Sequence, residues 1–254
     1  MNVWKLVKIE WIKVKRSKIL PLLLIAPLLV VASGVTSLKR YMTPEYPHAW
    51  AAMFIQSALI YSYYLLPLTM IVVCVMIAGR ETANNGILKM LALPIRRQTL
   101  SAAKFFVLLF YLVLEMAVFL VAFVIAGLLV TARTGIAETL PILDLVKWSC
   151  SLFFTMIPSV TIMWAITVLF EKSLFSVGLN LFLVLPGVLA ANTPLWFAYP
   201  YCYSGYLVSC SLHDATATGI GNGFEMIPFL PCALAITGLA LWISITRFGK
   251  KEMR

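Results

Sequence analysis

Glu115 is the one clear acidic residue inside a long apolar stretch of this sequence, about ten residues into the run 105–130. Burying a carboxyl group in a hydrocarbon layer is costly, so an acid at such a depth marks a candidate functional site. Two interpretations fit this residue type. Either Glu115 lines a path for a substrate, or its carboxyl group ties neighbouring helices together by hydrogen bonds to Gln56, Asn180 or a hydroxyl group.

Sequence motifs for catalysis and for metal binding are missing from the chain. There is no GxxxxGKS/T loop to bind the phosphates of ATP, no GxSxG nucleophile motif and no pair of intramembrane aspartates. Metal-binding spacings such as CxxC and HExxH do not occur either, and the two histidines, His48 and His213, lie far apart. We therefore expect a protein that is not an enzyme, that holds no metal or cofactor of its own, and that takes any ATP-derived energy from a partner.

The elements that position Glu115 are expected to be membrane-spanning helices. Hydrophobic residues make up 62% of the chain, charged residues make up 12%, and the mean hydropathy is +0.95, which excludes an ordinary soluble domain. Six apolar runs are long enough to cross a hydrocarbon layer about 30 Å thick; they are 19–38, 53–78, 105–130, 148–170, 175–192 and 226–246. The predicted fold class is an all-α polytopic membrane protein with six transmembrane helices, which form one domain over 19–254.

The distribution of Lys and Arg predicts which ends of the helices face the cytoplasm. Most of the 20 basic residues lie in the segments 5–18 and 80–104 and after residue 246, which fall on one side of a six-span topology. Positive charge favours the cytoplasmic side, so we expect both the N- and the C-terminus there. The net charge of +10 then reflects topology and attraction to anionic lipid head groups, and we expect no binding to nucleic acid.

The segment 80–104 is a long polar island between the second and third apolar runs. Asn84, Asn85 and Gly86 break the preceding helix, and Pro94 stops the helix that follows. The short helix between these breaks carries an apolar set, Ile87, Leu88, Leu91 and Leu93, and it is followed by the cations Arg96, Arg97 and Lys104. A loop that only joins two spans needs few residues, so we expect this helix to dock onto another protein. The alternative is an interfacial loop that rests on lipid.

The residues 1–18 are predicted to form an amphipathic helix in the membrane interface. Val3, Val7, Trp11 and Val14 recur at helical spacing, with lysines available to the opposite flank. Two roles are open for this helix. It anchors the first span, or it forms part of a cytoplasmic docking surface beside the segment 80–104.

The outer segment 193–225 is apolar and aromatic in its first half and polar in its second half. Aromatic residues suit the membrane interface, so we expect a re-entrant or interfacial hairpin with Trp196, Tyr199 and Tyr203 as a candidate outer interface. Cys202 and Cys210 lie eight residues apart in this segment, and the sequence leaves open whether they form a disulfide.

Taken together, the six spans, the amphipathic N-terminal helix, the outer hairpin and the loop pattern E-x4-G-x7-P-x-R-R resemble ABC-2 type permeases. The matching residues of the pattern are Glu81, Gly86, Pro94, Arg96 and Arg97, with Lys104 at the start of the third span. The size of the chain makes it look most like the permease subunits of lantibiotic-protection and bacitracin-type exporters of Gram-positive bacteria.

This resemblance implies a role and a set of partners. The segment 80–104 would contain the coupling helix, which seats in a separate ABC ATPase subunit, present in two copies, that carries the ATP and Mg. The residues it assigns to coupling are Glu81, Gly86, Ile87, Leu88, Leu91, Pro94, Arg96 and Arg97. A second six-span permease would complete a heterodimer in the bacterial plasma membrane, and the substrate would be an amphipathic antimicrobial peptide.

Two other classes of function stay open. The chain is a permease for another cargo, such as a lipid, a glycan precursor, a drug or an ion. Alternatively, it is a membrane scaffold or sensor that transports nothing.

Overall fold

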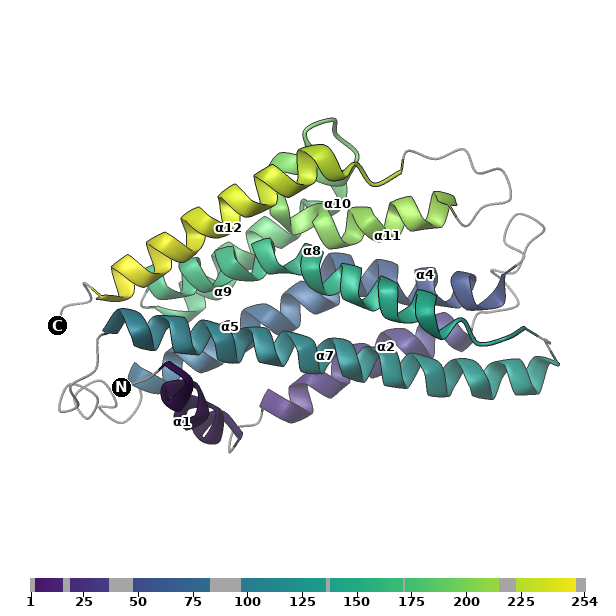
Figure 1. The fold of residues 1–254 in the computed structure, drawn as a ribbon, viewed down its shortest axis with the longest axis horizontal. Coiled ribbons are helices and arrows are strands. Elements are labelled where there is room, and N and C mark those ends of the chain that lie inside the picture. The colour runs from purple at the N-terminus through teal and green to yellow at the C-terminus, as the bar shows by residue number, and fades with distance from the viewer. Residues whose placement is uncertain are drawn as a thin grey trace.

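A computed structural model describes residues 3–15, 19–36, 48–82, 97–135, 138–170, 172–214 and 223–249 (Figure 1). All regular secondary structure within these ranges is helical, which confirms the predicted all-α class. The long helices are α1 (Val3–Lys15), α2 (Ile19–Thr36), α4 (Ala49–Ile60), α5 (Leu66–Thr82), α7 (Arg97–Thr134), α8 (Ile142–Leu169), α9 (Ser173–Val184), α11 (Tyr203–Asp214) and α12 (Met226–Gly249). The short elements are the π-helix η1 (Tyr61–Leu65), the helix α10 (Gly187–Ala191) and the 3₁₀ turns η3 (Trp196–Ala198) and η4 (Pro200–Cys202).

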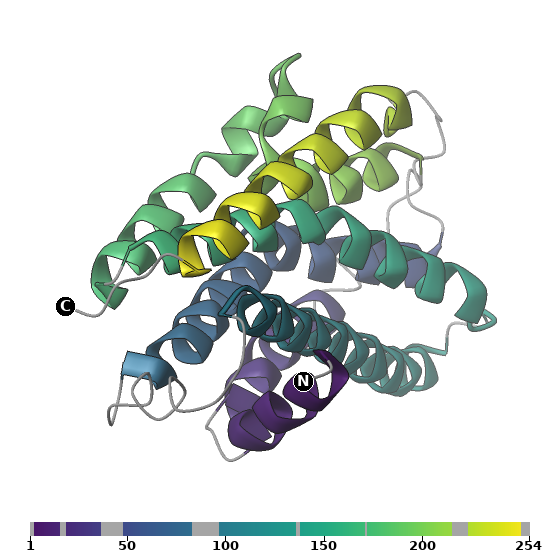
Figure 2. The ribbon, with the colours of Figure 1, turned by 60° about the vertical axis from the view of Figure 1, so that its left-hand side comes forward.

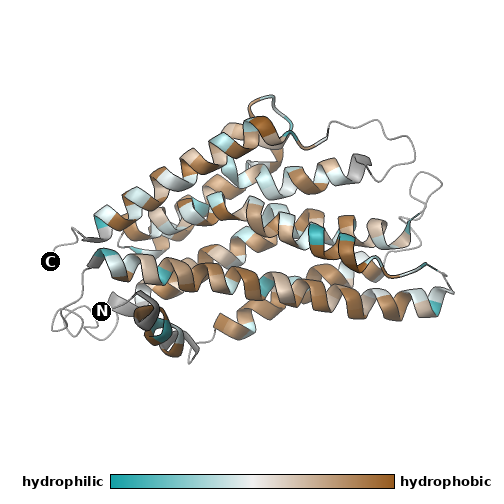
Figure 3. Ribbon diagram, in the orientation of Figure 1, coloured by the Kyte–Doolittle hydropathy of each residue, from teal (hydrophilic) through white to brown (hydrophobic). Residues whose placement is uncertain are grey.

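Within the described residues, six stretches of helix are long and apolar enough to cross a membrane, as the sequence predicts. They are Ile19–Thr36, Ala49–Gly79, Gln98–Thr134, Ile142–Leu169, Ser173–Ala191 and Met226–Arg247. The second span joins α4, η1 and α5 into one continuous rod, and the fifth joins α9 to α10. Hydrophobic residues run along the length of all six spans (Figure 3).

The helix α1, the beginning of α7 and the end of α12 lie at the same end of the bundle, on the left in Figure 1. An even number of spans places the N- and C-termini on the same side of the membrane. That this side is the cytoplasm stays a prediction from the Lys and Arg distribution.

The second and fourth spans form the centre of the bundle, and the sixth lies at its edge. Within the most apolar window of each span, 72% of the residues of the fourth are buried inside the protein, but only 17% of those of the sixth. Large side chains such as Ile227, Leu234 and Trp242 of α12 are exposed. The outward faces of α9 and α12 therefore meet lipid or another protein.

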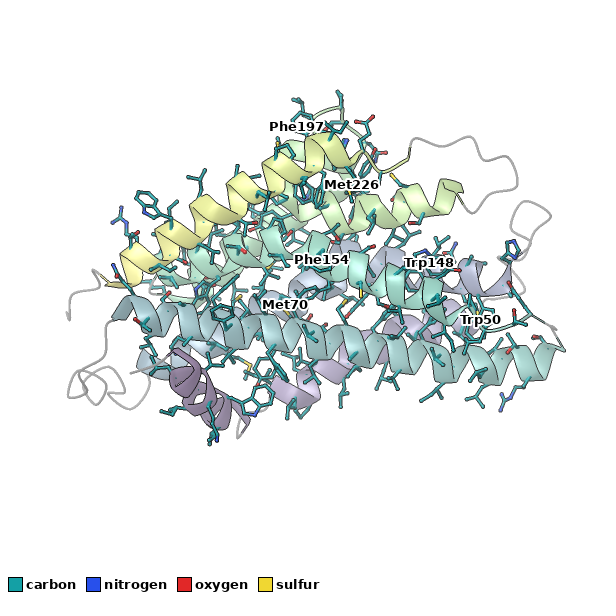
Figure 4. All side chains as sticks on the ribbon, viewed as in Figure 1. Trp50, Met70, Trp148, Phe154, Phe197 and Met226 are labelled. Atoms are coloured by element: carbon teal, nitrogen blue, oxygen red, sulfur yellow. The ribbon has the colours of Figure 1, made fainter. Side chains whose placement is uncertain are left out.

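Aromatic rings fill the space between α4, α7 and α8. Phe54 packs edge-on against Phe119 at 5.8 Å and lies 4.8 Å from the ring of Trp148. Trp50 and Trp148 both lie toward the right-hand end of the bundle (Figure 4). The fit is close at Gly127 of α7, where an added Cβ atom would lie 2.3 Å from the ring of Trp50. A glycine there lets α7 approach α4.

The chain turns back on itself after α10, and the following helix α11 packs against α4, η1 and α8 (Figure 1). Two of the rings that the sequence assigns to an outer interface, Trp196 and Tyr203, are buried in an aromatic cluster with Tyr63, Tyr206 and Phe229. Tyr199 is half-buried, and its hydroxyl donates to the carbonyl of Leu183. The aromatic composition of this segment thus reflects packing between helices of the protein itself.

Candidate functional site

The predicted coupling segment lies largely outside the described residues. Of the coupling residues, Gly86, Ile87, Leu88, Leu91, Pro94 and Arg96 fall in the undescribed range 83–96. Glu81 lies in the last turn of α5, and Arg97 begins α7. The structure therefore places the two ends of the segment but not the helix expected between them.

The ends of α5 and α7 are joined by Lys104, a buried cation. Its Nζ atom donates to the backbone carbonyl of Ile77 at 3.4 Å, and it lies 3.4 Å from Oε2 of Glu10. The two charged side chains are only 2% and 5% exposed. One lysine thus connects α7 to α5 and to the N-terminal helix α1, at the C-terminal end of the predicted coupling segment 80–104.

Trp11 reinforces the contact between α1 and α7. Its ring meets that of Phe110 edge-on at 4.0 Å and stacks on Tyr111 at 5.9 Å. Figure 2 shows α1 lying across α7 and beside α2. The face of α1 that is turned to the bundle also carries Leu6, which is 2% exposed, whereas Ile9 and Ile12 are exposed.

Sequence reasoning missed Glu10, because an acid among many lysines reads as part of a solvated face. One signal in the sequence does point to it. Glu10 follows Leu6 by four residues, a spacing that puts both side chains on one face of a helix. A buried carboxylate is stabilised by a cationic partner, and Lys104 of α7 supplies one here.

Glu115 lies in the interior of the bundle and is fully buried. Its Oε1 atom accepts a hydrogen bond from the Thr69 hydroxyl of α5 at 2.7 Å. The hydroxyl of Tyr61, in η1, lies beside the same carboxyl group. In this conformation neither that hydroxyl nor Oε2 of Glu115 has a hydrogen bond of good geometry to any described residue. The hydrogen-bonding capacity of Glu115 and Tyr61 is therefore only partly used.

Asn180 and Gln56 are the other two polar residues predicted to bond to Glu115. The hydrogen bonds of Asn180 go to other groups. Asn180 of α9 donates to the carbonyl of Ser176 and accepts a bond from the Tyr201 hydroxyl at 3.3 Å. It thus ties α9 to the turn η4. Gln56 is half-buried on α4, in the turn before η1. At this depth of the bundle α7 is tied to α5 by the bond between Glu115 and Thr69. A hydroxyl group is one of the three kinds of partner that the sequence predicts for Glu115.

Cys202 and Cys210 are both buried, and they form no disulfide with each other. The Cys202 thiol lies 3.0 Å from the carbonyl oxygen of Tyr199 and 3.3 Å from that of Trp196, and burial raises the pKa of this thiol to about 12. Eight residues along a helical path separate the two α-carbons by about 12 Å, which is beyond the reach of a disulfide. Across the described part of the chain, no cluster of three or more metal-ligating side chains occurs.

Comparison with known proteins places the chain in a family. No curated protein matches it at a significant level. A sequence model of a family described as ABC-2 family transporter protein matches residues 6–187, which is well over half of the chain. The match runs from α1 through all of the fifth span except its last residues, and so includes Glu10, Lys104 and Glu115. The chain therefore belongs to the ABC-2 family of transporter proteins.

Proposed function

We propose that this chain is the membrane-spanning subunit of an ATP-driven exporter, and that the segment 80–104 carries the coupling helix. Proteins of the ABC-2 family are membrane components of transporters and associate with an ATPase subunit. With its six apolar helices, this chain is a multi-pass protein of the plasma membrane. The ATP and Mg of the cycle would be held by the ATPase subunit, in two copies per transporter.

The observation that carries this proposal is the buried contact of Lys104 with Ile77 and Glu10. A loop that only links two spans transmits no movement, so the helices at its two ends do not have to be held together. Here one buried side chain holds the end of α5, the start of α7 and α1 as a unit. A force applied to the coupling segment by a moving ATPase would therefore act on three helices together.

The exposed apolar faces of α9 and α12 support a second permease as a further partner. A shallow hollow on α9, lined by Lys172, Leu174, Phe175, Gly178 and Leu179, is almost entirely apolar. Leu174 and Phe182 are 86% and 71% exposed, respectively. We propose that a different six-span permease covers such a face, so that the transmembrane unit is a heterodimer.

For the cargo we propose an amphipathic antimicrobial peptide of the lantibiotic type, returned to the outside of a Gram-positive cell as self-protection. The support is the resemblance in size and topology to permeases of that kind. A lipid, a glycan precursor, a drug or an ion is the alternative cargo. Susceptibility profiling of a deletion strain separates them, since the proposal requires a selective gain of sensitivity to cationic peptides.

The test of the permease assignment is purification of the tagged protein from its host in mild detergent, followed by mass spectrometry and an ATPase assay. We expect a Walker-motif ATPase and a second six-span protein. Glu81→Ala and Leu91→Asp should reduce recovery of the ATPase, whereas Leu174→Asp on the exposed face of α9 should spare the ATPase and reduce recovery of the second permease. Recovery of the protein alone, or with a sensor kinase and no ATPase, overturns the assignment.

A further inference from the structure

The second span changes its helical geometry at its middle. Between α4 and α5 the backbone forms the π-helix η1, in which the N–H of Leu66 donates to the carbonyl of Tyr61 five residues earlier. The residue that follows Leu66 is Pro67, which has no N–H. The Ser62 carbonyl therefore loses both of its helical partners, because the N–H of Leu66 is already used and Pro67 offers none. Short π-helices of this kind are frequent at functional sites.

The free carbonyl of Ser62 is satisfied from the helix α11. The Ser204 hydroxyl donates to it at 3.0 Å, across 142 positions of the sequence. The ring of Tyr63 lies directly on Gly205 of α11, where an added Cβ atom would come within 2.2 Å of it. The Tyr63 hydroxyl also lies 3.2 Å from Oγ of Ser209. One face of η1 is thus fitted closely to α11.

The opposite contact of η1 is with the third span, α7. The ring of Tyr61 is fully buried and stacks on Phe119 at 4.7 Å, and its hydroxyl lies beside the Glu115 carboxyl group. Eight residues after Tyr61, Thr69 donates to the same carboxyl group. The π-helix η1 therefore lies between the helix α11 and the buried Glu115. From η1, the helix α5 continues to Ile77 and the coupling segment.

We propose that η1 is the hinge of the second span, and that Ser204 and Glu115 are positioning residues that link this hinge to α11 and to α7. The proposal rests on the proposed function, because the movement it transmits begins at an ATPase. A small rotation at η1 would bring Tyr61 and Oε2 of Glu115, which lack good partners here, into a hydrogen bond with each other. In this second arrangement of the second span, the hydrogen bond between Tyr61 and Glu115 would compensate for the hydrogen bonds that the rotation breaks.

The hinge is tested on the whole transporter, with its ATPase, in lipid nanodiscs. Hydrogen–deuterium exchange is followed with and without ATP plus vanadate, and ATP hydrolysis is measured on the same preparation. We expect nucleotide to change the exchange rate of amides in 60–67 and in 203–211 together, by at least fivefold. Thr69→Val and Ser204→Ala should abolish the change in 203–211 while leaving ATPase binding and hydrolysis within twofold of the wild type.

Two matched variants control for the loss of a buried hydroxyl group. Thr155→Val and Ser244→Ala remove hydroxyls whose hydrogen bonds, among the described residues, go to carbonyls of their own helices, so the nucleotide response should be unchanged. Glu115→Gln keeps an acceptor for Thr69 and should retain the response, whereas Glu115→Leu should lose it. A retained response in Glu115→Gln shows that the hydrogen bond to Thr69 is required, and not only the volume of the side chain. The Glu115→Gln variant also keeps the test valid if Glu115→Leu fails to fold.

The outcomes separate the hinge from the proposed function. If nucleotide changes exchange in 70–82 and 97–104 but not in 60–67 or 203–211, the ATPase is coupled to the chain and the hinge is wrong. If the transporter contains no ATPase, or if nucleotide changes exchange nowhere in the chain, the proposed function fails and the hinge fails with it. Equal responses in Thr69→Val, Ser204→Ala and the controls would also reject the hinge.

Discussion

The Nζ atom of Lys104 lies 3.4 Å from Oε2 of Glu10, and both side chains are almost completely buried. A charge pair removed from water stabilises a fold little compared with an apolar pair, but each partner makes the other necessary. The pair therefore fixes one arrangement of α1 on α7. The N-terminal helix is thus part of the helix junction that Lys104 forms with α5 and α7.

Removing one member of this pair should be far more damaging than removing both. In Lys104→Met the buried carboxylate of Glu10 loses the ammonium group of Lys104, and we expect a loss of about 3–5 kcal/mol in stability. The double variant Glu10→Leu with Lys104→Met should recover most of that loss. The measurement is the free energy of unfolding in mixed micelles, followed by tryptophan fluorescence.

The exposed pair Asp144–Lys147 provides the control for the buried one. Its atoms lie 3.5 Å apart, but its side chains are 54% and 73% exposed, so Lys147→Met should cost less than about 1 kcal/mol. Equal losses in Lys104→Met and Lys147→Met, or additive losses in the double variant, would show that Glu10 and Lys104 do not depend on each other.

The close contact of α7 with α4 should tolerate no added atom at Gly127. A Cβ atom in Gly127→Ala would lie 2.3 Å from the Trp50 ring, so either the ring or the helix must shift. We expect a loss of about 1–3 kcal/mol. Gly238→Ala is the matched control, since nothing lies within 4 Å of its Cβ position. Thermal unfolding of the two variants side by side tests the contact, and equal midpoints would contradict it.

The membrane spans could be predicted from the sequence because the signal that defines them is local. A run of about 20 apolar residues is sufficient, whatever lies beside it. The predicted runs 19–38 and 226–246 differ from the observed spans Ile19–Thr36 and Met226–Arg247 by only one or two residues at their ends. The third span begins earlier than predicted, because Lys104 and its neighbours continue α7 instead of preceding it.

The functional contacts could not be predicted in the same way, because they join residues far apart in the chain. The carbonyl of Ser62 is freed by a local cause, Pro67, but its partner Ser204 is 142 positions away. Trp196 and Tyr203 have the composition of a membrane interface and are nevertheless buried against other helices. Residue type alone does not distinguish a ring facing lipid from one facing protein.

Glu138 should contribute to stability by capping the first residues of the second span. Its Oε2 atom accepts the backbone N–H groups of Ala49 at 2.8 Å and Trp50 at 3.4 Å. A carboxylate at a helix N-terminus satisfies free donors and complements the helix dipole. Glu138→Ala should cost about 1 kcal/mol, whereas Glu138→Gln should cost less because its oxygen still accepts.

The measurement for this cap is again the unfolding free energy, with Glu225→Ala as the control. Glu225 is exposed, so its removal should have little effect. A loss in Glu138→Ala no larger than in Glu225→Ala would mean that the cap contributes nothing.

The Cys202 thiol should react slowly with alkylating reagents while the fold is intact. Only the thiolate is nucleophilic, and burial raises the pKa of this thiol from 9.0 to about 12, so at pH 8 its thiolate fraction falls about a thousandfold. Because the folded-state pKa lies above the working range, the alkylation rate should rise about tenfold per pH unit from 8 to 10. Quenched alkylation with N-ethylmaleimide, read by peptide mass spectrometry against the same protein unfolded in dodecyl sulfate, measures this rate. Rapid labelling of the folded protein, or an oxidised peptide joining Cys202 to Cys210, would show that η4 and α11 open in solution.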